Sequence, residues 1–469
     1  MSFTSLAFWI FFVLVLTFYW LVREKRWQNI ILLIASYIFY GWVHPGLAVM
    51  LGVSTGIDFF LAKRMSAQNV SGTKRPLLLL SLVLNLGVLA FFKYYNFFSE
   101  DLVRIADILG VQSDFLLTRI LLPAGLSFYT LKKLGYMIDV SRGTLQPTHS
   151  FIDFALYVSF FPQIVAGPID RPQKLLPQIE VGRTWKAEYF YSAWHLILMG
   201  LFKKLVIASS VGSITERIFH LEQPTVLLAV AGALGFTLQI LADFSAYTDL
   251  SRGVAYLLGF ETSENFKSPY LSLTPTDFWN RWHITLSFWL RDYVFFPMRR
   301  FLLSKQRQFP TWAAQVIPPL VTMLISGIWH GAGWNYVLWG GMYGLLIVAY
   351  QSIGMGGNWK PGSNLQAFFA WLVMFSFIVF GWLLFAAPSL DWVAKIFSSP
   401  IVGSLEQQGV ALIALSITFV YSIPLIAKML IDRSANEESI LHSLYYAAAT
   451  AVIFIYINSV TPDFIYFQF

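Results

Sequence analysis

The sequence of 469 residues contains no cysteine, and its charged residues are scarce. Without thiols the chain can have no disulfide framework, no thiolate metal site and no cysteinyl covalent intermediate. Charged residues make up 12% of the chain, against roughly a quarter in an ordinary soluble domain. Hydrophobic residues make up 57% and recur along the whole length, so we expect no large water-soluble domain.

The short motifs of several common enzyme sites are also missing. The sequence has no HExxH pair, no Walker A loop, no GxGxxG opening a helix, no GxSxG elbow and no EF-hand loop. Two histidines, His283 and His330, stand without a carboxylate placed beside them by spacing, which makes a weak case for a metal site. We predict no bound metal and no bound cofactor.

Long apolar runs dominate what is present. Residues 3–22 form a run of about 20 residues, enough for a helix to cross the hydrocarbon core of a bilayer. This run has no basic segment before it and no small-residue cleavage site after it, so we interpret it as a retained membrane helix. Similar runs predict an all-α polytopic integral membrane protein with about ten to thirteen membrane-crossing or re-entrant helices.

The distribution of charge predicts the orientation of the chain. In a soluble protein the net charge of +7 would suggest an anionic partner, but in a membrane protein Lys and Arg gather in cytoplasmic loops. The first four loops are basic, neutral, basic and acidic in turn. We therefore expect an extracytoplasmic N-terminus, a membrane lipid environment and no nucleic-acid partner.

Two histidines stand out in otherwise apolar surroundings. His283 lies in residues 277–293, which are rich in both charge and tryptophan, and His330 lies where an apolar run meets glycines. Because ionisable groups at membrane depth are costly, they usually face a cavity or a partner. Both histidines are therefore candidates for a functional site.

Residues 277–293 have a pattern that suits a helix. Residues four apart would then share a face, which would bear Trp279, His283, Ser287 and Arg291. The start signal at residues 274–277 leaves three possible caps, which are Thr274, Thr276 and Asp277. The alternative is a structural helix at the membrane interface, anchored by its tryptophans.

His330 is flanked by Gly327, Gly331 and Gly333. Imidazole titrates near neutral pH and is the commonest general base, and the small neighbours would leave space for a substrate. The alternative is that the glycines serve helix packing and that His330 is a buried structural ring.

A third polar cluster closes the apolar run that ends near residue 242. Asp243, Tyr247 and Asp249 could orient His330 or bind a substrate hydroxyl. The carboxylates could equally pair with arginines, for which the candidates are Arg252, Arg281 and Arg291.

These segments together resemble the membrane-bound O-acyltransferase (MBOAT) family, and within it the bacterial alginate O-acetyltransferase branch. The resemblance covers residues 122–350. It is carried by residues 278–283 (FWNRWH) with Leu286, Ser287, Trp289 and 291–293, by 329–331 (WHG), and by residues 136–143, 165–168, 243–249, 264–266 and 269–272. It implies a single membrane domain, 1–469, with N-terminal helices at 1–114, a catalytic core at 115–350 and C-terminal helices at 351–469.

The resemblance also implies a function. A many-helix funnel would join the cytoplasm to the outside in a bacterial cytoplasmic (inner) membrane. An acyl group would come from a cytoplasmic thioester, with acetyl-CoA as the expected co-substrate. An extracytoplasmic protein would receive it for O-acetylation of an exported, alginate- or cellulose-like polysaccharide. D-alanyl transfer to teichoic acid and O-acetylation of peptidoglycan are alternatives, and a transporter or export channel with a histidine relay is an alternative of another class.

The family's invariant histidine matches His330 and its second histidine matches His283. His330 would act as base or transient acyl carrier. His283 and Asp292 would shape the funnel, and Arg281 and Arg291 would hold anionic or structural partners. The remaining supporting or substrate-binding candidates are Ser287, Trp329, Asp243, Tyr247 and Asn335.

Overall fold

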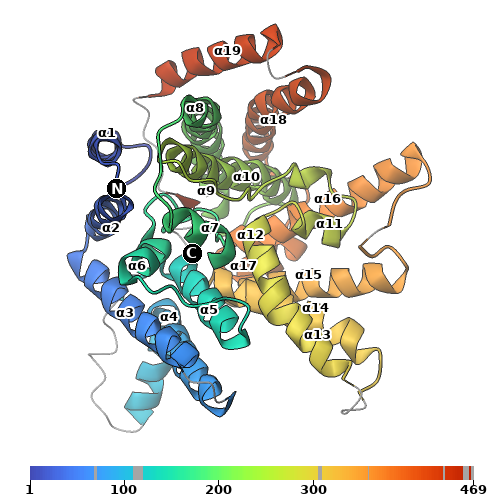
Figure 1. Cartoon of the computed structure of the whole chain (residues 1–469). Helices are drawn as coiled ribbons and strands as arrows, with labels where there is room; N and C mark the ends of the chain where they lie inside the picture. Colours follow the sequence, from blue (N-terminus) through green and yellow to red (C-terminus); the bar gives the residue numbers. More distant parts are fainter. Residues whose placement is uncertain are drawn as a thin grey trace. The chain divides into compact units, whose positions relative to one another are not determined.

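A computed structural model describes residues 1–67, 71–108, 120–304, 309–357, 359–436, 439–457 and 464–465. These residues form helices joined by loops and contain no β-strand, only one isolated bridge (Figure 1). Within the described ranges, seven helical stretches have the length and hydropathy needed to cross a membrane, and Leu6–Leu21 and Ile440–Tyr456 are shorter apolar helices. The all-α polytopic prediction is confirmed. The seven stretches are Pro45–Ser66, Lys74–Ser99, Ala187–Phe219, Val226–Leu257, Ala313–His330, Asn364–Ala386 and Leu405–Ser434.

The chain forms two compact units. The first comprises Met1–Trp194 and Ser251–Ser263, and the second comprises His195–Leu250 and Glu264–Phe469. The predicted division into N-terminal helices, core and C-terminal helices stays a prediction, and its first boundary, at residues 114 and 115, lies outside the described residues.

The first unit contains the N-terminal helices and a buried irregular segment. Residues 160–170 follow the last helical turn at Ser159 without forming a helix, and all of them are buried. Irregular backbone of this kind is stable in a membrane protein only when it is enclosed by protein or lines a cavity. The helices are α1 (Leu6–Leu21), α2 (Lys25–Gly41), α3 (Pro45–Ala67), α4 (Ser71–Ile108), α5 (Leu126–Arg142), α6 (Phe151–Ser159), α7 (Pro172–Ile179) and the start of α8 (Ala187–Phe202).

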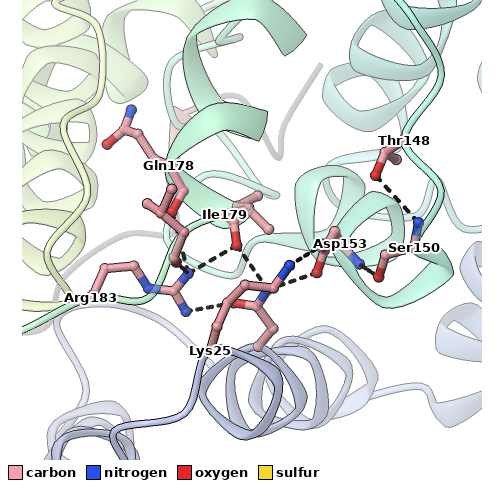
Figure 2. A network of polar contacts seen from close by, with 9 residues as sticks. Lys25, Thr148, Ser150, Asp153, Gln178, Ile179 and Arg183 are labelled. Atoms are coloured by element: carbon pink, nitrogen blue, oxygen red, sulfur yellow. Dashed lines mark hydrogen bonds and ion pairs between the residues drawn. The ribbon is translucent and has the colours of Figure 1, made fainter.

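A polar network fastens α7 to α2 and α6 in this unit (Figure 2). Arg183 donates to the Ile179 and Val181 carbonyls at 3.1 and 2.8 Å, which are acceptors that the end of α7 leaves open. Lys25 of α2 forms an ion pair with Asp153 of α6 at 2.9 Å. The buried side chains of this network are therefore paired and hold short helices in place.

A second polar cluster lies within the apolar helices of the first unit. Asp58 of α3 accepts hydrogen bonds from Ser81 at 2.6 Å and from Asn85 at 2.9 and 3.1 Å, both in α4. Lys133 of α5 completes the cluster with an ion pair to Asp58 at 3.4 Å, and both side chains of the pair are 1% exposed. Three helices are thus joined by one buried carboxylate.

The second unit contains the remaining helices. Two π-helical segments, η2 (Lys203–Ala208) and η4 (Arg291–Phe295), interrupt its α-helices, and η3 (Pro269–Leu271) is a 3-10 turn. The α-helices are the end of α8, α9 (Ser209–Phe219), most of α10 (Val226–Leu257), α11 (Pro275–Trp279), α12 (Ile284–Leu290), α13 (Phe296–Leu302), α14 (Ala313–His330), α15 (Trp334–Ser352), α16 (Asn364–Ala386), α17 (Leu390–Ser398), α18 (Leu405–Ser434) and α19 (Ile440–Tyr456).

Helices α14 and α15 lie side by side in this unit (Figure 1), and glycines let their backbones meet. A Cβ atom on Gly327 would lie 2.1 Å from the Tyr336 carbonyl oxygen, and one on Gly340 would lie 2.3 Å from the Met323 carbonyl oxygen. No side chain fits at either place without moving the helices apart. Since α14 ends at His330, this packing places the histidine.

We expect Gly340→Ala to destabilise the protein by about 1–3 kcal/mol, because the added methyl group must push α14 away from α15. Gly341→Ala is the matched control, since its Cβ would lie 3.7 Å from Leu324 Cδ2, an ordinary van der Waals contact. Thermal unfolding of the two variants in detergent tests this. Equal melting temperatures would show that the close contact carries no constraint.

Candidate active site

His283 lies in a break between two helices. The prediction of a continuous helix over residues 277–293 is wrong, because α11 ends at Trp279 and α12 begins at Ile284. Of the three candidate caps, Thr274 is the N-cap of α11, and its hydroxyl accepts a hydrogen bond from the Asp277 amide at 3.1 Å. His283 itself has φ 41° and ψ 53°, the left-handed conformation that costs a side-chain-bearing residue energy.

Asn265 explains why the helix breaks here. Its backbone oxygen accepts from the Ile284 amide at 3.0 Å, and its side-chain Oδ1 accepts from the Thr285 amide and hydroxyl at 3.2 and 2.7 Å. A β-bridge joins Phe266 to Trp282 just before the turn. These bonds replace the helical ones and hold His283 in its strained conformation.

The rings of both histidines lie close to one tryptophan, Trp329. The Trp329 ring centroid is 6.1 Å from that of His283 and 4.9 Å from that of His330. Trp339 and Phe385 also contact the His330 ring, at 5.2 and 5.4 Å. The structure thus brings two histidines that are 47 positions apart in the sequence close to the same tryptophan (330 − 283 = 47). His283 is 1% exposed and His330 4%, so the funnel stays a prediction.

Aromatic side chains next to His330 carry buried hydrogen-bond donors. Within the described part of the chain, the indole nitrogens of Trp279, Trp339 and Trp382 and the Tyr343 hydroxyl have no hydrogen-bond partner. Trp339 contacts the other three rings at 5.6, 6.2 and 5.3 Å, respectively. Buried donors of this kind usually have an acceptor, which leaves a ligand or water to supply one.

Burial lowers the pKa of His283 to about 3, so the ring is neutral in the folded protein at physiological pH. In the unfolded chain this ring binds a proton as the pH falls below about 6.5, whereas in the folded protein it stays neutral down to about pH 3. The free energy of unfolding therefore falls as the pH falls from about 6.5 towards 3.

We expect His283 to lower the free energy of unfolding by about 2 kcal/mol between pH 6.5 and pH 5, at about 1.4 kcal/mol per pH unit. The melting temperature of His283→Gln should fall less steeply over this range than that of the wild type. Parallel curves would contradict the buried neutral ring.

Asp243 and Asp249 form ion pairs, but not with the predicted arginines. Lys204 lies 2.8 Å from Asp243, and Lys203 lies 2.6 Å from Asp249. The lysines belong to the π-helical segment η2, whose wider turn directs two successive side chains towards α10. Sequence reasoning missed both lysines, because helical periodicity places successive residues on different faces.

Asp243 also binds the C-terminal segment. Its Oδ2 atom accepts from the Ile465 amide at 2.9 Å, and the Phe464 ring lies 4.5 Å from that of Tyr247. Phe244, the next residue along α10, contacts the His283 ring at 4.7 Å. Asp243 and Tyr247 therefore lie on the helix that contacts His283, but the contact itself is made by their neighbour Phe244.

The other predicted supporting residues make local contacts. Arg281 pairs with Asp277 at 2.7 Å and Arg291 with Asp292 at 3.0 Å, and these four side chains are all about a third exposed. Ser287 donates to the Trp282 carbonyl at 3.0 Å, and Asn335 donates to the Ala387 carbonyl at 3.2 Å. Their roles towards a substrate stay predictions. In the described ranges no group of three or more His, Asp or Glu side chains could hold a metal ion.

A comparison with known protein families identifies the class of protein to which the chain belongs. The family model described as MBOAT, membrane-bound O-acyltransferase family, matches residues 140–385. The chain belongs to this family of membrane-bound O-acyltransferases.

Among individual relatives, the chain is 35% identical over 400 residues to the probable alginate O-acetylase AlgI of Pseudomonas aeruginosa, which covers 85% of this chain and 74% of that one. It is 29% identical over 457 residues to the peptidoglycan O-acetyltransferase of Helicobacter pylori, covering 91% and 81%. It is 30% identical over 274 residues to the teichoic acid D-alanyltransferase of Bacillus subtilis, covering 56% and 68%.

Proposed function

We propose that this acyltransferase moves an acetyl group from acetyl-CoA on the cytoplasmic side to an acceptor outside, for O-acetylation of an exported polysaccharide. The observation that supports this best is that both histidine rings lie close to Trp329, and that His330 also contacts Trp339, whose indole nitrogen and whose neighbour Tyr343 are unpaired buried donors. Such donors suit the carbonyl oxygen of an acyl group, and a neutral imidazole suits an attacking hydroxyl.

His330 acts as the general base in this proposal. It takes the proton of the acceptor hydroxyl as the hydroxyl oxygen bonds to the thioester carbon, and the carbonyl oxygen becomes negatively charged. When the tetrahedral intermediate collapses, the carbon–sulfur bond breaks and the thiolate takes the proton from His330. The products are the acetyl ester and free CoA, and no proton is gained or lost overall.

The polymer is the finer part of the proposal. The similarity to a probable alginate O-acetylase supports an exported glycan, and an extracytoplasmic protein would complete the transfer. The similarity to a peptidoglycan O-acetyltransferase, which covers 91% of the chain, makes peptidoglycan the second candidate acceptor. D-alanyl transfer has less support, because that relative covers 56% of the chain.

The test uses purified protein in lipid nanodiscs with acetyl-CoA labelled in the acetyl group. We expect release of CoA, with the label passing to water or to an added acceptor, and faster release when the matching extracytoplasmic partner and polymer are supplied. Label transfer from D-alanyl carrier protein but not from acetyl-CoA would replace the donor. Solute uptake into liposomes that is independent of any thioester would favour a transporter instead.

A further inference from the structure

We propose that the Asn265 side-chain amide is a catalytic hydrogen-bond donor that binds the carbonyl oxygen of the acyl thioester, in addition to holding the His283 turn. This inference rests on the proposed function. Asn265 is 1% exposed and lies in the loop after α10.

The orientation of the Asn265 amide is fixed by its partners. The Thr285 backbone N–H can only donate, so the atom that faces it at 3.2 Å is the oxygen Oδ1. The Thr285 hydroxyl donates to the same oxygen at 2.7 Å. Nδ2, which is bonded to the same carbon as Oδ1, therefore lies beside the His283 turn with its two hydrogens directed away from Thr285.

Nδ2 is a buried donor with no hydrogen-bond partner among the residues that the structure describes. A buried donor left unpaired is costly, and the cost is avoided when a ligand brings an acceptor. The other polar atom of the same side chain has two partners, so the site is not loosely packed. The hydrogen bonds to Oδ1 hold the Asn265 side chain in place, and Nδ2 remains available to donate to a ligand.

The surroundings fit a carbonyl ligand. His283 follows directly on the bridged residue Trp282, and its ring lies 6.1 Å from Trp329, which precedes His330. Among the residues that the structure describes, no acidic side chain is hydrogen-bonded to Asn265, so no carboxylate in contact with this amide would repel an oxygen with developing negative charge. A rigid amide N–H in a dry site stabilises such an oxygen because it needs no reorganisation during the reaction.

The test compares two unreactive analogues of acetyl-CoA. In the first the thioester sulfur is replaced by CH2, which leaves a ketone, and in the second the ketone oxygen is also removed, which leaves an alkyl chain. We expect the wild type to bind the ketone about tenfold more tightly than the alkyl analogue. In Asn265→Leu this preference should disappear, and kcat with acetyl-CoA should fall about a hundredfold or more, as when an oxyanion-hole donor is removed.

Thr285→Val is the matched control, because it removes one donor to Oδ1 and leaves Nδ2 in place. It should keep the preference for the ketone. If Asn265→Leu does not fold, Asn265→Asp replaces it, since it retains an acceptor for Thr285. Its ionised form should bind the ketone no better than the alkyl analogue at high pH.

An equal loss of affinity for both analogues in Asn265→Leu would overturn the proposal and leave Asn265 a positioning residue only. Binding of neither analogue by the wild type, with acetyl-CoA inert, would instead refute the proposed acetyl-CoA donor. The two failures are thus distinguishable.

Discussion

His330→Ala should lower the rate of acetyl transfer by about 10²- to 10⁴-fold, the contribution typical of a general base. The ring lies at the C-terminal end of α14, 4.9 Å from Trp329 and 5.2 Å from Trp339 by ring centroids. Without it no group at this position would take the proton of the acceptor hydroxyl. The measurement is CoA release from acetyl-CoA by purified wild type and variant, at substrate concentrations that separate kcat from KM.

The loss should fall on kcat, because the base acts in the transition state and not in substrate binding. Since alanine also leaves a cavity, His330→Gln provides a variant of closer shape. His442→Gln is the matched control, because His442 is another buried histidine of the second unit and pairs with Asp432 at 3.0 Å. His330 would not be the base if both His330 variants folded and kept kcat within a few-fold of the wild type.

The fold class could be predicted from the sequence because a membrane-crossing helix requires a long run of apolar residues, which is visible without knowledge of the structure. Runs such as residues 225–242 are long and apolar whatever their neighbours, so a helix was predicted there, although α10 extends to Leu257. The same signal failed at residues 277–293. There the helical pattern is real on each side of the break, but Asn265, some 20 residues earlier, takes the backbone hydrogen bonds of Ile284 and Thr285. A contact between distant residues overrides a local pattern.

The candidate site was predicted for a different reason. His283 and His330 are ionisable residues in apolar surroundings, which marks each of them without knowledge of the fold. That both rings lie close to Trp329 was not predicted, since spacing in sequence gives no distance in space. The partners of Asp243 and Asp249 were missed because a π-helical turn aims Lys203 and Lys204 together at α10, and its sequence carries no familiar signal.

Removing one partner of the buried ion pair in the first unit should have the largest effect on stability. We expect Asp58→Leu to lower the free energy of unfolding by about 3–5 kcal/mol, because it leaves the Lys133 ammonium buried without its carboxylate. Ser81 loses its carboxylate acceptor as well, and the Asn85 amide keeps only its bonds to Ser81. The measurement is unfolding in mixed detergent micelles, followed through the midpoint and slope of the transition.

The double variant Asp58→Leu with Lys133→Met separates the charge from the packing. Replacing both charges by apolar side chains removes the uncompensated ammonium, and such replacements are often neutral in stability. Most of the loss should therefore be recovered, leaving only the cost of the hydrogen bonds that Ser81 and Asn85 made to Asp58. Lys395→Met is the control, since the solvent-exposed Lys395–Asp391 pair should contribute little to stability. A double variant as unstable as Asp58→Leu would mean that the carboxylate stabilises α3 and α4 through Ser81 and Asn85, and that the lysine adds little.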